Sequence, residues 1–230
     1  MIFLALYTIS DLHLSFGADK PMDVFRGWEN YTDRIIANWN RVITDNDTVV
    51  LPGDFSWGLK IEETLNDFKF LNRLNGRKII GKGNHDLWWG TKKKIEEFFE
   101  QNEIKNVDIL FNNAFLVDGI SVCGSRGWFF DSNDSDNKII KREAARLETS
   151  IKEGIALGGE PIVFIHYPPV YADMVCREIF DVIKKYNVKR VYHGHIHGAG
   201  FNKAVSHFDG VDFKLVSCDC VDFTPIFVKR

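Results

Sequence analysis

One pattern recurs along this chain and limits its fold more than any other feature: a short apolar run that stops at a group of Asp, His or Asn residues. The example with the most polar groups is Ile79-Ile80-Gly81-Lys82-Gly83-Asn84-His85-Asp86. A continuous apolar run that ends at glycine is typical of a strand buried on both faces, as in a parallel sheet. Ligand-binding residues collect where such strands end, so we expect the chemistry of this protein at that edge.

The same pattern occurs at four other predicted strand ends. In an Asp-x-His or His-x-His sequence the two side chains point to the same face, because side chains of an extended segment alternate with a period of two. The chain therefore offers donors for a pair of metal ions if Asp54 is shared between them. The seven candidate ligands are Asp11, His13, Asp54, Asn84, His166, His195 and His197.

The placement of the histidines supports a metal site. Six of the seven histidines, all except His207, lie in or beside these strand ends, and packing needs alone do not account for that clustering. We interpret His193 and His207 as structural residues. Cys218-Asp219-Cys220 is a weaker metal-binding candidate, and we expect these cysteines to serve packing because they lack paired CxxC spacing.

Apolar periodicity predicts an α/β fold with helices outside two packed mixed β-sheets, formed by one domain over residues 1–230. Asp118-Gly119 and Asp209-Gly210 are typical hairpin turns and indicate antiparallel strands beside them. We expect helices over residues 28–42, 61–74, 91–101, 138–156 and 173–186, and strands over residues 1–9, 48–51, 77–81, 109–111, 114–117, 120–123, 161–165, 190–192, 204–208, 213–217 and 224–228.

Composition narrows the class of partner and the compartment. The chain has a net charge of −3 and lacks the basic excess that accompanies sequence-independent nucleic-acid binding, so a nucleic-acid partner is not supported. No apolar run approaches the ~20 residues that cross a bilayer, and we expect no membrane association. Four scattered cysteines and an N-terminal segment without a basic-then-apolar pattern predict a cytoplasmic protein with reduced thiols.

The motifs together resemble the signature of the calcineurin-like metallophosphoesterases, which runs Asp-x-His, Gly-Asp, Gly-Asn-His-Asp/Glu, a lone His, and Gly-His-x-His. This chain has all five in order between residues 11 and 197. One departure is Trp57, which stands where many members have the last Asp of Gly-Asp-x-x-Asp, so the substrates of those subgroups do not transfer. The resemblance implies a four-layer α/β/β/α sandwich and a dinuclear centre in which one metal is held by Asp11, His13, Asp54 and His197 and the other by Asp54, Asn84, His166 and His195.

The resemblance also implies the reaction: hydrolysis of a phosphomonoester or phosphodiester by in-line attack of a hydroxide held between two divalent metal ions. Nitrogen and oxygen donors without thiolate suit Mn, Fe, Co, Ni or Zn, and the expected partner is a small phosphorylated substrate. Two alternatives stay open. One is a nuclease acting on DNA or RNA ends, and the other is a non-catalytic binding module on the same scaffold, although a decayed site would have lost donors that are all present here.

Three further residues are candidates for catalysis or substrate contact. We expect His85 to donate a proton to the leaving oxygen, with Asp86 fixing the tautomer of its imidazole. Arg126 is a candidate for contact with a substrate phosphate, with a surface ion pair as the alternative. A group of aromatic residues could wall the pocket, although we expect them to serve packing: Trp88, Trp89, Trp128, Phe129 and Phe130.

Overall fold

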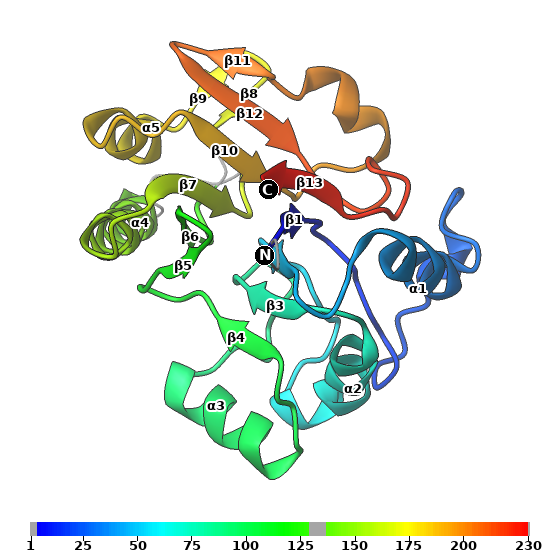
Figure 1. Ribbon diagram of the computed structural model, residues 1–230. Helices are drawn as coiled ribbons and strands as arrows, with labels where there is room; N and C mark the ends of the chain where they lie inside the picture. The colour runs from blue at the N-terminus through cyan, green and yellow to red at the C-terminus, as the bar shows by residue number, and fades with distance from the viewer. Residues whose placement is uncertain (1–3, 129–136, 230) are drawn as a thin grey trace.

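The computed structural model describes residues 4–128 and 137–229, and two mixed β-sheets form its centre (Figure 1). The first sheet has the order β13-β1-β2-β3-β4, with β13 antiparallel to β1 and the other pairs parallel. The carboxyl ends of the central strands therefore meet at one edge. The strands are β1 (Leu6–Thr8), β2 (Thr48–Leu51), β3 (Arg77–Ile80), β4 (Val107–Ile109) and β13 (Ile226–Lys229).

The second sheet has the order β11-β12-β10-β7-β6-β5, with the four inner strands parallel and the two edge strands antiparallel. Both predicted Asp-Gly turns join an edge strand to its neighbour, with φ of 44° and 75° at Asp118-Gly119 and 45° and 75° at Asp209-Gly210. These angles are those of hairpin turns, which confirms the prediction. The strands are β5 (Phe115–Val117), β6 (Ile120–Ser125), β7 (Glu160–Ile165), β10 (Arg190–His193), β11 (His207–Phe208) and β12 (Val211–Leu215), beside a separate pair, β8 (Val170–Tyr171) and β9 (Met174–Val175).

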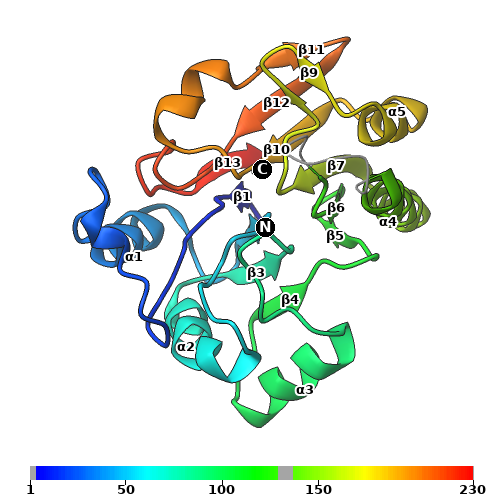
Figure 2. The same ribbon diagram turned by 180° about the vertical axis from the view of Figure 1, so that it is seen from behind.

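Helices cover the outer face of each sheet, as both views show (Figures 1 and 2). In β2, Val49 and Leu51 pack toward the helices while Val50 packs toward the other sheet, so the strand is buried on both faces. This explains the continuous apolar runs and confirms the four-layer arrangement. The first sheet carries α1 (Tyr31–Val42), α2 (Leu65–Arg73) and α3 (Lys92–Gln101), and the second carries α4 (Asn137–Ala156) and α5 (Arg177–Lys185). The 3-10 turns of the described residues are η1 (Met22–Val24), η2 (Ile61–Thr64) and η4 (Gly198–Lys203).

The two sheets meet directly at the ends of β1 and β12. The backbone N–H of Ser10 donates to the carbonyl of Val216 at 2.8 Å, and the N–H of Cys218 donates to the carbonyl of Ser10 at 2.9 Å. This contact turns the strand ends of both sheets toward one region, where donors that are distant in sequence can meet.

Several boundaries differ from the sequence-based expectation. The helix expected from residue 173 begins at Arg177, because Met174–Val175 pairs with Val170–Tyr171 as a short antiparallel ladder. The first turn of the helix expected over 61–74 is a 3-10 turn, and the strand expected over 204–208 is confined to His207–Phe208. Residues 1–3 of the first expected strand and most of the acidic loop before α4 lie outside the described residues. Within residues 4–128 and 137–229, no helix has the length and apolar character needed to cross a membrane.

Candidate metal centre

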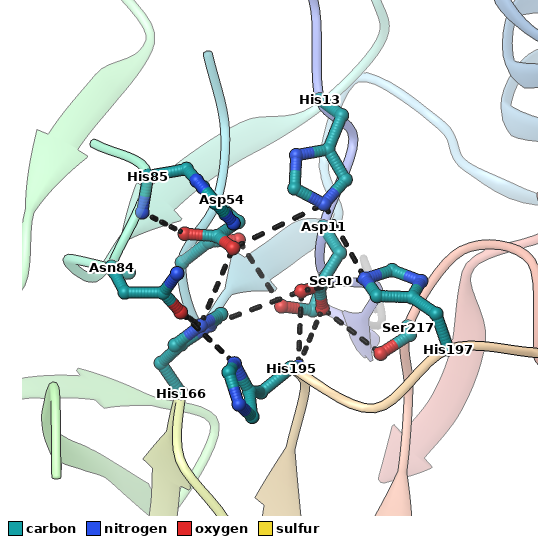
Figure 3. A network of polar contacts seen from close by, with 12 residues as sticks. Ser10, Asp11, His13, Asp54, Asn84, His85, His166, His195, His197 and Ser217 are labelled. Carbon is teal, nitrogen blue, oxygen red and sulfur yellow. Dashed lines mark hydrogen bonds and ion pairs between the residues drawn. The ribbon is translucent and has the colours of Figure 1, made fainter. Parts of the chain in front are cut away.

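The seven candidate ligands follow strands of both sheets, and their side chains point into one common space (Figure 3). One part of this space lies between β1 and the loop after β10. There, Nε2 of His197 is 3.3 Å from Nε2 of His13 and 3.4 Å from Oδ1 of Asp11. These three potential ligand atoms lie close enough together to bind one cation.

The second part of the space lies between β2, β3 and β7. Nε2 of His166 is 3.4 Å from Oδ2 of Asp54 and 2.7 Å from Oδ1 of Asn84, and the same amide oxygen is 2.9 Å from Nδ1 of His195. The two parts share Asp11 as well as Asp54, since Oδ1 of Asp11 is 3.9 Å from Nδ1 of His166. Ligand atoms lie within 4.8 Å of one another in two overlapping groups, Asp11 with His13 and His197, and Asp11 with Asp54 and His166.

The chemical state of these groups fits divalent metal ions. Burial lowers the pKa of His13 to about 3 and lowers that of His166 well below its ordinary value, so both rings are neutral and have a free lone pair. Within the described part of the chain, Nδ1 of each ring is buried without a hydrogen-bond partner. Burial, followed by the negative charges of Asp11 and Asp86, raises the pKa of Asp54. A bound cation would offset the cost of ionising this carboxyl group.

The backbone holds four of the donors in the left-handed region. The φ angles are 58° at Asp11, 48° at His13, 51° at Asp54 and 72° at His195. Such angles are uncommon outside glycine, and strained positions of this kind gather at functional sites. Backbone bonds between loops fix them: the N–H of Asp11 donates to the carbonyl of Gly53 at 3.0 Å, and that of His13 to the carbonyl of Asp54 at 3.0 Å.

The glycines of the motifs allow the donors to approach the backbone closely. A Cβ at Gly83 would lie 2.0 Å from Oδ1 of Asp54, and a Cβ at Gly194 would lie 2.1 Å from Oδ2 of Asp11. No side chain fits at either position without displacing a candidate ligand. These glycines are therefore part of the site's construction.

Asp86 is fully buried and bonds to the backbone of the site. One oxygen accepts the N–H groups of Asp54 at 2.9 Å and Gly83 at 2.7 Å, and the other accepts Nε1 of Trp88 at 3.1 Å and the N–H of Phe55 at 3.0 Å. The sequence predicts a bond from this carboxylate to the imidazole of His85, whereas the bonds that the structure shows join the loops after β2 and β3. Asp86 therefore holds the backbone of Asp54 in position.

His85 lies beside the donors. Its N–H donates to Oδ1 of Asp54 at 2.8 Å, and its ring centroid is 4.2 Å from that of Trp57 and 5.6 Å from that of His13. Burial lowers the pKa of its imidazole. The ring of His85 therefore lies next to the candidate ligands, in a partly apolar setting.

Sequence reasoning missed the groups that orient the donors. Oδ1 of Asp219 lies 2.8 Å from Nδ1 of His197, a carboxylate–histidine pair of the kind that fixes the orientation of a metal-binding ring. Burial lowers the pKa of His197, but its bonds to Asp11 and Asp219 outweigh that effect and raise it to about 10. The hydroxyl of Ser217 donates to Oδ2 of Asp11 at 3.0 Å. Ser217 is the last residue of the strand expected over 213–217 and Asp219 follows it, which was the available signal.

Arg126 was a candidate for contact with a substrate phosphate. Its guanidinium is 4.6 Å from the ring centroid of Trp128 and 3.9 Å from Oε1 of Glu143, and it lines a separate small hollow. A contact with substrate stays a prediction.

The aromatic residues near the donors pack as we expected where they are described. Trp88 and Trp89 are 4% and 8% exposed and belong to the core. Phe129 and Phe130 lie outside the described residues. His193 is buried, and His207 pairs with Asp212 at 2.7 Å on the surface.

The family model described as calcineurin-like phosphoesterase matches residues 5–199, and the chain belongs to that family. An uncharacterized protein of Methanocaldococcus jannaschii is 31% identical over 98 residues, which are 40% of this chain and 52% of that protein, so the chain spans about half the length of this curated relative.

Solved structures share the fold at low sequence identity. A protein from Thermus thermophilus has a TM-score of 0.60 at 12% identity, covering 99% of each chain. A protein of unknown function from Aquifex aeolicus has a TM-score of 0.56 at 18% identity, covering 98% of this chain and 96% of that one. The phosphopantetheinyl hydrolase of Mycobacterium tuberculosis has a TM-score of 0.50 at 15% identity, covering 93% and 88%.

Proposed function

We propose that this protein hydrolyses a small phosphomonoester or phosphodiester at a centre of two divalent metal ions, with water as the attacking group. The observation that carries the proposal is the convergence of all seven donors, from strand ends of both sheets, into one space (Figure 3). A scaffold retained only for binding would have no need to keep every donor or to strain the backbone at four of them.

The proposed ligands follow the family's division. One metal ion would be held by Asp11, His13, Asp54 and His197, and the other by Asp54, Asn84, His166 and His195. When bound, such ions lower the pKa of a water molecule and neutralise phosphate oxygens. The nitrogen and oxygen donor set suits Mn, Fe, Co, Ni or Zn.

The chain's own contribution to the chemical step is assigned to His85. A proton at its imidazole would pass to the leaving oxygen as the ester bond breaks, and the same N–H would stabilise a phosphoryl oxygen beforehand. General acid catalysis of this kind contributes about 10²- to 10⁴-fold in rate. Asp86 supports the step indirectly, because its bonds to the N–H groups of Asp54 and Gly83 set the loop from which His85 projects.

The test combines turnover with metal content. The Mn-supplemented chain is assayed with p-nitrophenyl phosphate, bis-p-nitrophenyl phosphate and a nucleotide panel, and a chelated sample serves as the metal-free comparison. Asp54→Asn should lose metal and turnover, whereas Asp118→Asn, in a hairpin turn where Asn is tolerated, should lose neither. His85→Ala should keep its metal and lose at least about 100-fold in turnover.

Each alternative has its own outcome in the same experiment. Loss of metal in His85→Ala would contradict the assigned role of that residue. Degradation of labelled oligonucleotides in preference to the small esters would favour the nuclease, and full metal content without hydrolysis of any ester would favour the binding module.

A further inference from the structure

A hollow of about 430 Å³ opens directly from the donor cluster, and three site histidines form part of its wall: His13, His85 and His197. Hollows of this size are typical of small-molecule sites. An ester whose phosphate lies at the donors must place its organic group in space next to these rings. The rest of the hollow's lining therefore bears on which ester is accepted.

The lining beside the histidines includes apolar side chains whose contacts hold them in place. The ring of Trp57 is stacked on that of His13, with centroids 5.0 Å apart and planes at 22°, and its Nε1 lies 3.4 Å from Sδ of Met22. Trp28 is 5% exposed, and its ring lies 5.9 Å from that of His197. These walls are preformed, so a ligand gains apolar contact without first ordering them.

The mouth of the hollow exposes large apolar side chains on and after η1. Phe25, which lines the hollow, is 55% exposed, and the adjacent Val24 is 71% exposed. A single exposed apolar residue needs no explanation, but neighbouring ones at the rim of a concave site indicate a binding surface. The charged side chains on the lining include Arg26 and Asp219, and Asp219 is paired with His197 at 2.8 Å. Much of the remaining lining is apolar, and it suits an apolar group: Met22, Phe25, Trp28 and Trp57.

A second hollow, of about 500 Å³, lies on the other side of Trp57 and His85. Its lining includes Asp19, Lys20 and Glu63 and lacks His13 and His197. It touches the site only through His85 and is more charged, so the first hollow is the better continuation of the donor cluster.

We propose that the first hollow binds the organic group of the substrate, and that the protein selects small phosphate esters whose organic group is uncharged and apolar, of the size of an aromatic ring. This inference deepens the proposed function and rests on it for the position of the phosphate.

The test uses two phosphonates of similar charge, methylphosphonate and benzylphosphonate, titrated calorimetrically into the Mn-loaded chain. Because a buried ring gains affinity in proportion to its apolar area, benzylphosphonate should bind about tenfold tighter or more. Phe25→Ala should bring the two dissociation constants closer together. Two control variants each remove an exposed leucine elsewhere and should keep the wild-type ratio: Leu87→Ala, in the second hollow, and Leu116→Ala, on edge strand β5.

The outcomes separate this inference from the proposed function. Equal affinity for the two phosphonates in a chain that hydrolyses esters overturns the apolar site. The apolar site is also overturned if Leu87→Ala lowers the ratio of the two dissociation constants and Phe25→Ala leaves that ratio unchanged. A clear ratio in a metal-loaded chain that hydrolyses no ester supports the apolar site and overturns the proposed function.

Discussion

Replacing Gly83 by alanine tests whether the close approach between loops builds the metal centre. A Cβ there would lie 2.0 Å from Oδ1 of Asp54 and 2.3 Å from the backbone nitrogen of the same residue. Non-bonded heavy atoms sit roughly 3.5 Å apart at their optimum, so Asp54 and its loop must move by about 1.5 Å. A displacement of about 1 Å at a catalytic site costs on the order of 100-fold in rate.

We therefore expect Gly83→Ala to lower kcat/KM by about 100-fold or more, equivalent to about 2.7 kcal/mol of transition-state stabilisation. The protein should still fold, because overpacking of this kind typically costs about 1 to 3 kcal/mol of unfolding free energy. The matched control is Gly81→Ala, two residues earlier, where the nearest atom to a Cβ would be Cα of Pro52 at 3.6 Å, an ordinary contact.

The measurements are ester hydrolysis, metal per chain by elemental analysis, and denaturant unfolding for the wild type and both variants. Wild-type metal content and turnover in Gly83→Ala would refute the reasoning. Equal damage in Gly81→Ala would show that a methyl group anywhere in this loop is harmful, and that the approach to Asp54 is not the cause.

Two further predictions concern charge. Asp219→Asn should weaken metal binding by about 10- to 100-fold, measured by metal titration, because the ring of His197 loses its orienting carboxylate. The control Asp212→Asn alters a similar pair with exposed His207 and should leave metal affinity unchanged. Equal metal affinity in the two variants would contradict the orienting role of Asp219. Burial lowers the pKa of Lys78 from 10.5 to about 7. Between those values the unfolded chain binds more protons than the folded one, so the free energy of unfolding should rise with pH by up to about 1.4 kcal/mol per unit. Denaturant unfolding at several pH values checks this, and the slope should shrink in Lys78→Met; an unchanged slope would contradict it.

The fold and the residues that converge on the candidate site could be predicted because both are encoded locally. Apolar runs such as 48–51 are buried on both faces, and the polar residues after them reach the strand ends within a few positions. The Asp-Gly turns are equally local, since their backbone angles depend on two residues. The start of the last helix was misplaced because residues 173–176 carry no periodicity that distinguishes a helical turn from the short ladder of β8 and β9.

The contacts that tune the site could not be predicted, because they arise only when strands that are apart in the sequence pack together. Ser217 approaches Asp11 across the junction of β1 and β12, from 206 residues away along the chain. Asp219 approaches His197, 22 residues away, where the neighbouring strands β10 and β12 end. Asp86 is next to His85 in sequence, which suggested a bond between their side chains. The backbone N–H groups of two loops are buried and need an acceptor, and Asp86 supplies it.

Trp57 connects the chemistry of this site to its choice of substrate. It stands at a position where many members of the family have an Asp, and its ring packs on His85 and His13 while lining both hollows. A carboxylate there would add a charge beside the proposed proton donor, whereas the indole adds an apolar wall and holds the imidazole by contact. Both consequences come from one side chain, so Trp57→Ala should lower turnover and should also bring the dissociation constants of the two phosphonates closer together. Phe25→Ala, at the rim, is expected to change only the ratio of these dissociation constants. If Trp57→Ala kept the wild-type ratio, Trp57 would not contribute to the apolar wall.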